Sequence, residues 1–539
     1  MGCGACHGWL SGVFIIQYAM KIRLLGFDAL VPTRTLVRKT SGEKNSKSFG
    51  FMKTSFKPEN SAMIRFAKNY NDLHWLFMAA WLWHAVPAMR VAVLNVVGLS
   101  SSLLGRHMPR LAAFAEKRGL QAHAPAFPAL TCSAQAAMLT GTSPAEHGIV
   151  ANGWYDRECA EVRFWKQSNH LLHGKKIWDV LRRDSPGFTC AQLFWWYNMY
   201  SSVDFSITPR PLYPADGRKV FDIHTQPMGL RDDLKRDLGE FPFASFWGPA
   251  AGLASSAWIG ASARWIDERH APTLSLVYLP HLDYPLQKFG PAAPEIPAEL
   301  AKIDQLAGEL IDDYESRGVR VLVVSEYGIS PVNRPLHLNR LFRERGWLQL
   351  KDELGRETLD CGGSRAFAVA DHQIAHVYVN DPTIRQDVRV LLENTPGIAE
   401  VRCPPETWGV GIGSSRAGDF IAIAAPDAWF TYYFWDDDAL APDYARTIDI
   451  HRKPGYDPCE LFLDPHIPFP KLRIARFLMQ KKLGLRGLLD VIPLDASLVR
   501  GSHGRDKVPD AERPILLGSA WPVSAAADVY HAILDAVRH

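Results

Sequence analysis

Residues 127–152 read FPALTCSAQAAMLTGTSPAEHGIVAN, and this stretch decides how the rest of the chain is interpreted. Thr131 follows an extended segment and precedes a helical run, Cys132–Leu139. A Thr in that position can act as the N-cap of the helix. Helix N-termini also bind phosphate, and a hydroxyl placed there can attack phosphorus once a metal ion or a base removes its proton. Thr131 is therefore either a candidate nucleophile in a phosphate site or only a helix cap.

Buried strands alternate with helices on both sides of this stretch. Val91–Val97, Thr273–Leu279 and Val319–Val324 are apolar runs of the kind found in buried strands. Met108–Arg118 and Glu299–Arg317 have the apolar spacing of helices. This alternation predicts an α/β fold with a mostly parallel sheet between helices.

The residues that follow the strands are informative because chemistry in such sheets lies at the carboxyl ends of the strands. Gly98 comes directly after the first strand, and Asp283 comes four residues after the second. Ser325-Glu326-Tyr327-Gly328 comes directly after the third strand. We expect Asp283 and Glu326 to lie at one edge of the sheet, near Thr131.

A separate α+β segment lies within residues 365–435. It contains a strand, a helix and two further strands, predicted over Ile374–Val379, Thr383–Asn394, Ile398–Cys403 and Phe420–Ala424. Because this segment lies between two chemical motifs, we interpret it as an inserted cap. The predicted organisation is an N-terminal extension, a core in two pieces and a cap, over residues 1–88, 89–340 plus 480–539, and 341–479 respectively.

The composition excludes several classes of protein. The 60 basic and 57 acidic residues give a net charge of +3 and no general electrostatic case for binding nucleic acid or an anionic membrane. The mean hydropathy of −0.10 argues against a polytopic membrane protein. Eight cysteines in 539 residues are too few for a disulfide framework, which favours a reducing, cytoplasmic compartment.

The N-terminal extension is expected to be poorly ordered. Its two apolar runs, Trp9–Met20 and Trp75–Met89, fall short of the roughly 20 apolar residues that span a bilayer. Translation can also start at Met89, directly before the first strand. A start at Met52 or Met63 would instead make the second run a signal segment, so export stays open.

The stretch 127–152 resembles the type I phosphodiesterase/nucleotide pyrophosphatase family of the alkaline phosphatase superfamily. Members carry a pattern like F-P-x-x-T-x-P-N-x-x-x-x-x-T-G-x-x-P-x-x-H-G-I-x-x-N, and ten residues match it: Phe127, Pro128, Thr131, Thr140, Gly141, Pro144, His147, Gly148, Ile149 and Asn152. The flanking motifs follow in family order over about residues 90–505. The resemblance implies an alkaline-phosphatase-like core and a metal-dependent phosphodiesterase or pyrophosphatase that acts through Thr131 on a phosphorylated small molecule.

The resemblance also implies two metal ions, usually zinc. The first site takes the Asp and His of D-x-x-x-H and a late His. Here Asp283 and His503 are kept, but Gln287 stands where the first His is expected. Gln287 can offer an amide oxygen, a weaker donor than imidazole. His281, two residues before Asp283, is the best substitute for the missing His.

The second metal site has lost more of its ligands. The Asp expected before Gly98 is Val97, and the S-D-H-G motif reads Ser325-Glu326-Tyr327-Gly328. Asn95 lies too far down the strand to replace a ligand at Val97. Thr131 and Glu326 remain, which predicts one tightly bound divalent ion (zinc, or magnesium or manganese) rather than two. Glu326 then serves as the general base, or as a ligand of an ion that arrives with the substrate.

An alternative stays open: a catalytically inactive or strongly altered family member that binds a phosphorylated metabolite or a partner. Asn152 and Arg210 are candidates for contacts with the phosphoryl group, although Arg210 lies in a Pro-rich loop that also suits an ordinary surface arginine. Asp371-His372 and His376 have the spacing of a metal cluster, but we interpret them as scaffold residues.

Overall fold

The computed structural model describes residues 23–24, 27–28, 89–216 and 218–539. The chain divides into two compact units, Met1–Ala85 and Val86–His539. In the first unit, β1 (Arg23–Leu24) pairs antiparallel with β2 (Phe27–Asp28). The remaining residues of the N-terminal extension lie outside the described residues, so the expectation that it is poorly ordered stays a prediction.

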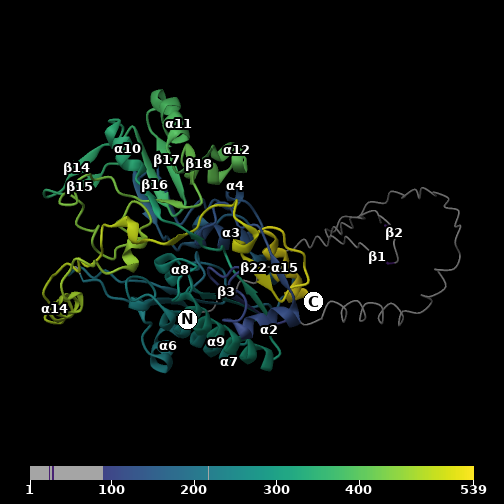
Figure 1. The fold of residues 1–539 in the computed structure, drawn as a ribbon. Helices are drawn as coiled ribbons and strands as arrows, with labels where there is room; N and C mark the ends of the chain where they lie inside the picture. The colour runs from purple at the N-terminus through teal and green to yellow at the C-terminus, as the bar shows by residue number, and fades with distance from the viewer. Residues whose placement is uncertain (1–22, 25–26, 29–88, 217) are drawn as a thin grey trace, which may run out of the picture. The chain divides into compact units, whose positions relative to one another are not determined.

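The second unit is built on one eight-stranded sheet, in the order β4-β22-β11-β3-β10-β7-β8-β9 (Figure 1). Five neighbouring strands pair in parallel: β11 (Arg320–Val324), β3 (Val91–Val96), β10 (Leu274–Leu279), β7 (Cys190–Leu193) and β8 (Phe205–Pro209). Three strands at the margins pair antiparallel: β4 (Leu120–Ala122), β22 (Ile515–Leu517) and β9 (Ile223–Gln226). The predicted α/β fold with a mostly parallel sheet is confirmed.

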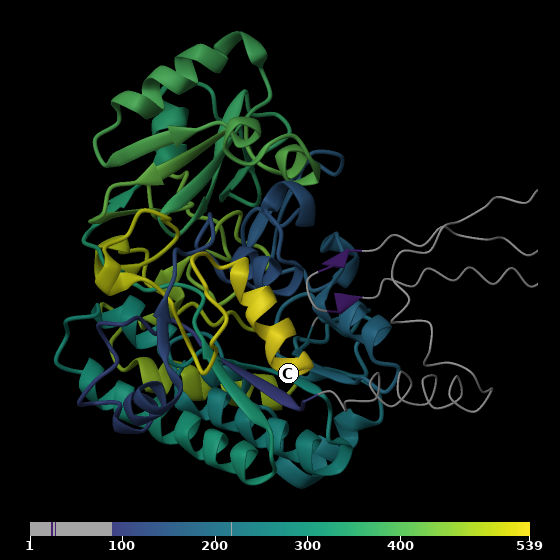
Figure 2. The ribbon, with the colours of Figure 1, turned by 90° about the vertical axis from the view of Figure 1, so that its right-hand side faces the viewer.

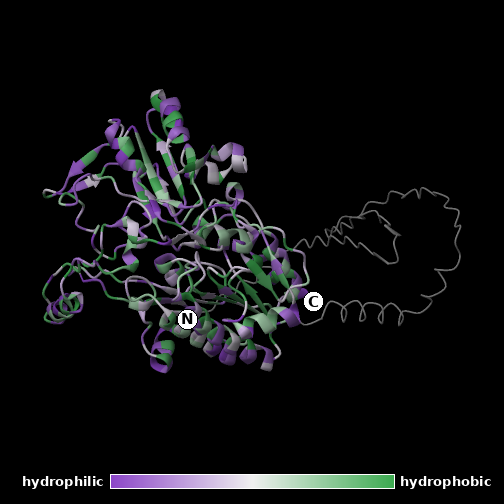
Figure 3. Cartoon of the chain, in the orientation of Figure 1, coloured by the Kyte–Doolittle hydropathy of each residue, from purple (hydrophilic) through white to green (hydrophobic). Residues whose placement is uncertain are grey.

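Helices cover both faces of this sheet, as Figure 2 shows from the side. One face carries α2 (Pro109–Arg118), α7 (Leu253–His270) and α9 (Ile296–Ser316), and the other carries α3 (Thr131–Thr140) and α15 (Asp528–Arg538). The central strands are buried on both sides, which explains why they are continuous apolar runs rather than alternating ones. Hydropathy follows the same division, with apolar strands inside and polar helix faces outside (Figure 3).

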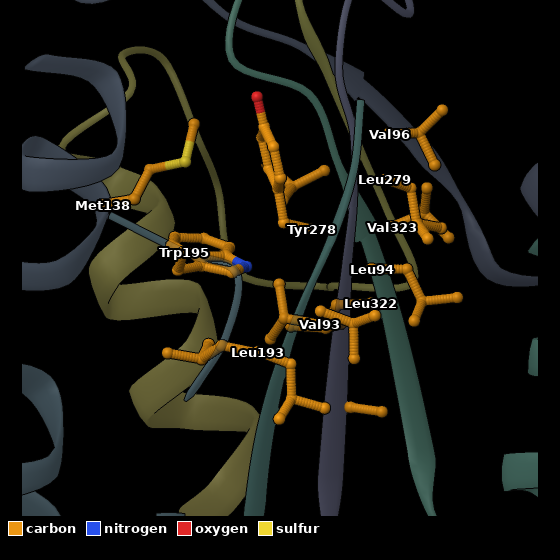
Figure 4. Packing of buried hydrophobic residues seen from close by; sticks show 14 of the residues in the cluster. Val93, Leu94, Val96, Met138, Leu193, Trp195, Tyr278, Leu279, Leu322 and Val323 are labelled. Atoms are coloured by element: carbon orange, nitrogen blue, oxygen red, sulfur yellow. The ribbon is translucent and has the colours of Figure 1, made fainter. Parts of the chain in front are cut away.

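Packing in the hydrophobic core holds α3 close against the sheet. Figure 4 shows Met138 of α3 beside Trp195 and Tyr278, on the opposite side of the strands from Leu94 and Val96. All ten residues of α3 are buried, which suits its small side chains. The first turn of this helix is therefore held rigidly at the carboxyl end of the strands.

A second sheet has four antiparallel strands, in the order β16-β17-β19-β18. Its strands are β16 (Ala366–Asp371), β17 (Ile374–Val379), β19 (Phe420–Ala424) and β18 (Ile398–Arg402), and α11 (Arg385–Asn394) packs against β18. The predicted strands and helix of this segment are confirmed. The tight turn between β16 and β17 contacts His503, which follows the short strand β21 (Gly501–Ser502), because the Gln373 amide donates to the carbonyl oxygen of His503 at 2.8 Å.

No helix among the described residues has both the length and the apolar character that crossing a membrane requires.

Candidate active site

The first turn of α3 presents Thr131 at the centre of the site. The helix begins at Thr131 itself, and the N-cap is Leu130, which has an extended backbone and no capping side chain. The expectation that Thr131 acts as the N-cap is therefore wrong by one residue, because Thr131 already has helical conformation. The first amides of a helix have no intrahelical acceptor; that of Cys132 donates to Oδ1 of Asn152 at 3.0 Å.

The Thr131 hydroxyl belongs to a chain of three oxygen atoms. It lies 3.0 Å from the hydroxyl of Tyr327, which follows β11. The Tyr327 hydroxyl in turn donates to Oδ1 of Asp283 at 3.4 Å. Asp283 opens α8 (Asp283–Phe289), directly after the turn that ends β10. Parallel strands thus bring these residues together at one edge of the sheet, as the sequence predicts.

The carboxyl group of Asp283 is held by side chains rather than by solvent. Its Oδ2 accepts a hydrogen bond at 2.7 Å from Nε2 of Gln287, one helical turn further along α8. Oε1 of Gln287 accepts from the hydroxyl of Tyr456 at 2.8 Å. Burial raises the pKa of Asp283 to about 7, although the hydrogen bonds from Gln287 and Tyr327 oppose this.

His503 offers an imidazole nitrogen to the same carboxyl group. Its Nδ1 lies 2.7 Å from the carbonyl oxygen of Ala129, which can only accept, so Nδ1 carries the proton. Nε2 has no hydrogen-bond partner and lies 3.9 Å from Oδ1 of Asp283. Burial lowers the pKa of His503 well below its ordinary value, which keeps the ring neutral. The ring stacks on Tyr327 with 3.6 Å between centroids.

Glu326 is the second buried carboxyl group of the site. Its Oε1 accepts two hydrogen bonds of 2.6 Å, from Nδ2 of Asn95 on β3 and from Nε2 of Gln135 on α3. Its Oε2 has no partner. Burial raises the pKa of Glu326 to about 8, against the opposing hydrogen bonds of Gln135 and Asn95. Asn95 thus positions Glu326 instead of replacing a lost ligand.

The turn between β16 and β17 supplies residues to the site, although their sequence pattern favours a scaffold role. Asp371 accepts from the backbone amide of Asn152 at 2.9 Å and from its Nδ2 at 3.1 Å. The next residue, His372, stacks on Tyr456 at 3.6 Å and lies 3.8 Å from the ring of His503, between centroids. The second sheet therefore completes one wall of the site.

Two predicted residues lie elsewhere. The ring of His281 faces Glu299 of α9, with Nε2 2.9 Å from the carboxylate. It lines a separate cavity of about 230 Å³ that also borders Lys288 and Lys302. Arg210 is exposed just beyond β8, and the structure does not bring it to Thr131. Asn152 does reach α3, but its amide is engaged by protein groups.

Comparison with known proteins identifies the family of this chain. The family model described as type I phosphodiesterase / nucleotide pyrophosphatase matches residues 91–457. The chain belongs to this family. An uncharacterized pyrophosphatase/phosphodiesterase of Schizosaccharomyces pombe is 26% identical over 273 residues, 47% of this chain and 47% of that protein. The chain thus aligns with about half the length of the curated relative it matches.

Two solved structures share the fold. A phosphonoacetate hydrolase from Sinorhizobium meliloti, in complex with phosphonoformate, has a TM-score of 0.53 and 13% identity, covering 84% of this chain and 96% of the other. An inactive murine ectonucleotide pyrophosphatase / phosphodiesterase 5, in complex with AMP, has a TM-score of 0.50 and 14% identity, covering 83% and 95%. At such identities the likeness shows the fold alone.

The metal positions implied for this phosphodiesterase family can be tested against the side chains present. The described residues contain no group of three or more His, Cys, Asp and Glu side chains arranged to hold an ion. At the first position, the unpartnered Nε2 of His503 faces Asp283, and this pair fits one divalent ion held by two side chains. At the second position Val97 and Tyr327 offer no strong ligand, and this site does not fit a resident ion.

Three polar residues of this site do not follow from the sequence interpretation. Gln135 lies four residues after Thr131, so helical spacing alone could have placed it on the same face. His372 has a signal in its position next to Asp371, although the sequence alone favours a scaffold role for both. Tyr456 lies in a long irregular segment and contacts the site only through the tertiary fold.

Proposed function

We propose that this chain is a phosphoester hydrolase of the phosphodiesterase/pyrophosphatase type, acting on a phosphorylated small molecule with Thr131 as nucleophile. The observation that carries the proposal is the position of the Thr131 hydroxyl. It lies at the first turn of a buried helix, 3.0 Å from Tyr327, between carboxyl groups whose pKa values are about 7 and about 8. Perturbed carboxyl groups gathered around a nucleophile are typical of active sites.

Each group then has a role in the reaction. The Thr131 oxygen forms a bond to phosphorus while the bond from phosphorus to the leaving oxygen breaks. The Thr131 proton passes to ionised Glu326, whose Oε2 has no hydrogen-bond partner and is free to accept it. Tyr327 orients the hydroxyl, and the helix dipole, with the first-turn amides other than that of Cys132, stabilises the charge that develops on the phosphoryl oxygens. Water then cleaves the phosphothreonine ester.

Asp283 and His503 are the residues that would hold one divalent ion, of zinc, magnesium or manganese. Such an ion, when bound, polarises a phosphoryl oxygen as a Lewis acid. Gln287 and Tyr456 act beside it by fixing the Asp283 carboxylate in place. Because His281 faces Glu299 and Gln287 bonds to Tyr456, only two protein ligands remain, and we expect weaker binding than the tight binding predicted from the sequence.

We also propose the domain organisation and compartment predicted above: a core of residues 89–340 plus 480–539, a cap of residues 341–479, and a cytoplasmic location. The contact of Gln373 with His503 supports a cap that closes over the core site. The six cysteines within the described residues are all free thiols, as expected in a reducing compartment.

A binding protein without turnover is the second candidate. The burial of the site favours this candidate, since Thr131 is only 4% exposed. The backbone amide of Cys132 also already donates to Oδ1 of Asn152 and is not free for a phosphoryl oxygen. In that case the residues would hold a phosphorylated ligand without cleaving it.

Hydrolysis of an aryl phosphodiester and an aryl phosphomonoester by the full chain distinguishes the two candidates. Zinc, magnesium and manganese are added one at a time. We expect turnover that Thr131→Ala reduces by roughly 10³-fold or more. The matched control is Thr140→Ala, at the far end of the same helix, where the hydroxyl bonds only to Ala136 and Thr142. Absence of turnover with every metal, together with saturable phosphate binding, would favour the binding protein.

A further inference from the structure

The segment from Phe469 to Leu488 exposes an unusual amount of apolar surface. It contains α14 (Pro470–Lys482), which lies at the margin of the second unit, away from the eight-stranded sheet (Figure 1). Seven large apolar side chains in it are more than half exposed: Phe469, Leu472, Leu478, Met479, Leu483, Leu485 and Leu488. Contiguous apolar patches of this kind usually mark an interaction site.

Two exposed side chains of α14 and that of its C-cap residue, Leu483, form a stripe. Leu472, Met479 and Leu483 are 68%, 65% and 70% exposed. At positions i, i+7 and i+11 they lie within a narrow arc of one helix face. Ile474 and Phe477, which lie on the other face, are half-buried against the protein. The stripe is therefore the outward surface of a helix whose inner face is already packed.

Basic residues flank this stripe on both sides. At 100° per residue, Lys471 and Lys482 lie on one side and Arg473 and Arg476 on the other. Residues 470–488 contain six Lys and Arg residues and no Asp or Glu. Arg473 is ion-paired with Asp490, just beyond this segment, and the other five basic residues leave the local surface basic although the whole chain is nearly balanced in charge.

Contacts with the loop around residues 212–221 hold the segment in place. Nζ of Lys481 donates to the carbonyl oxygen of Lys219 at 3.0 Å and lies 5.6 Å from the ring centroid of Phe221. The guanidinium of Arg486 donates to the carbonyl oxygen of Asp216 at 3.3 Å. The helix is therefore presented in a fixed orientation, with its stripe left outward.

We propose that α14 and the residues up to Leu488 dock this protein on the surface of a membrane that carries anionic lipids. An apolar stripe between rows of Lys and Arg matches a helix that lies in the interface, with its apolar face in the acyl boundary and its cationic ends among the headgroups. A protein partner would require complementary carboxylates around an apolar groove. The absence of any acidic residue from the segment favours the lipid surface, where all the opposing charges have one sign.

Sedimentation of the full chain with lipid vesicles tests the proposal. The vesicles contain phosphatidylcholine alone or phosphatidylcholine with 30% phosphatidylserine. We expect binding to the anionic vesicles that weakens in high salt, with little binding to the neutral ones. Leu472→Glu, Met479→Glu and Leu483→Glu together should lower the affinity at least tenfold, and Lys471→Glu with Lys482→Glu should lower it as well.

The matched control is Leu354→Glu, a fully exposed leucine in the β14–β15 hairpin (Leu350–Asp352 and Glu357–Leu359), which should bind like the wild type. Unchanged thermal unfolding of each variant shows that the fold is kept, since every altered side chain is exposed. Failure of the wild type to bind anionic vesicles, or equal binding by the triple variant, would overturn the proposal. A wild-type dimer that the triple variant dissociates without lipid would assign the surface to a second copy and also overturn it.

Discussion

Replacement of Glu326 by Gln is expected to stabilise the protein at alkaline pH. The carboxyl group is fully buried, and its pKa is raised from 4.5 to about 8. Between these values the unfolded chain releases the proton while the folded chain retains it. The contribution of Glu326 to the free energy of unfolding is therefore highest below about pH 4.5, falls as the pH rises, and levels off above about pH 8.

The size of the change in the free energy of unfolding follows from the pKa shift of Glu326. At about 1.36 kcal/mol for each pKa unit, the rise from 4.5 to about 8 corresponds to roughly 5 kcal/mol. Glutamine does not titrate, and its side-chain oxygen can keep the hydrogen bonds from Asn95 and Gln135. The stability gained by Glu326→Gln should therefore be near zero at pH 4.5 and rise to a few kcal/mol at pH 8.5.

Urea unfolding followed by tryptophan fluorescence, at pH 4.5, 6.5 and 8.5, measures this difference. The control is Glu116→Gln, on the solvent face of α2, for which we expect a change below about 0.5 kcal/mol at every pH. A difference between Glu326→Gln and wild type that does not grow with pH would refute the reasoning. A stabilised but inactive variant would show that this carboxyl group is kept for chemistry at the expense of stability.

Three further predictions concern the reaction. Tyr327→Phe removes the hydroxyl 3.0 Å from Thr131 and should lower kcat by roughly 10- to 100-fold with little change in KM, as steady-state kinetics would show; an unchanged kcat would exclude an orienting role. Asp283→Asn should weaken the binding of one manganese ion in a calorimetric titration. Tight binding of two manganese ions per wild-type chain would contradict the proposed loss of the second metal site. The rate should rise with pH to a plateau above about 8 as Glu326 ionises, and Glu326→Gln should abolish that rise.

The fold was largely predictable because its determinants are local. The runs Val91–Val97, Thr273–Leu279 and Val319–Val324 differ from the observed strands by a single residue each. A strand buried on both faces must be apolar throughout, so its sequence is easily recognised. Convergence of Asp283 and Glu326 at one edge then followed from the parallel pairing of these strands.

The less predictable parts of the site depend on turns and on tertiary contacts. His281 and Asp283 were expected on one side of the chain, but the strand ends before Pro280 and a turn directs His281 to Glu299. His372 and Tyr456 reach the site from the second sheet and from an irregular segment. No periodicity in the sequence reports such contacts.

The central claim is that Thr131 forms a covalent bond to phosphorus. Mass spectrometry of the full chain, acid-quenched during turnover of an aryl phosphodiester, tests it most directly. The account predicts a phosphoryl adduct on the peptide that contains Thr131, which disappears in Thr131→Ala together with the hydrolysis. Turnover that continues in Thr131→Ala, with no adduct in the wild type, would contradict it.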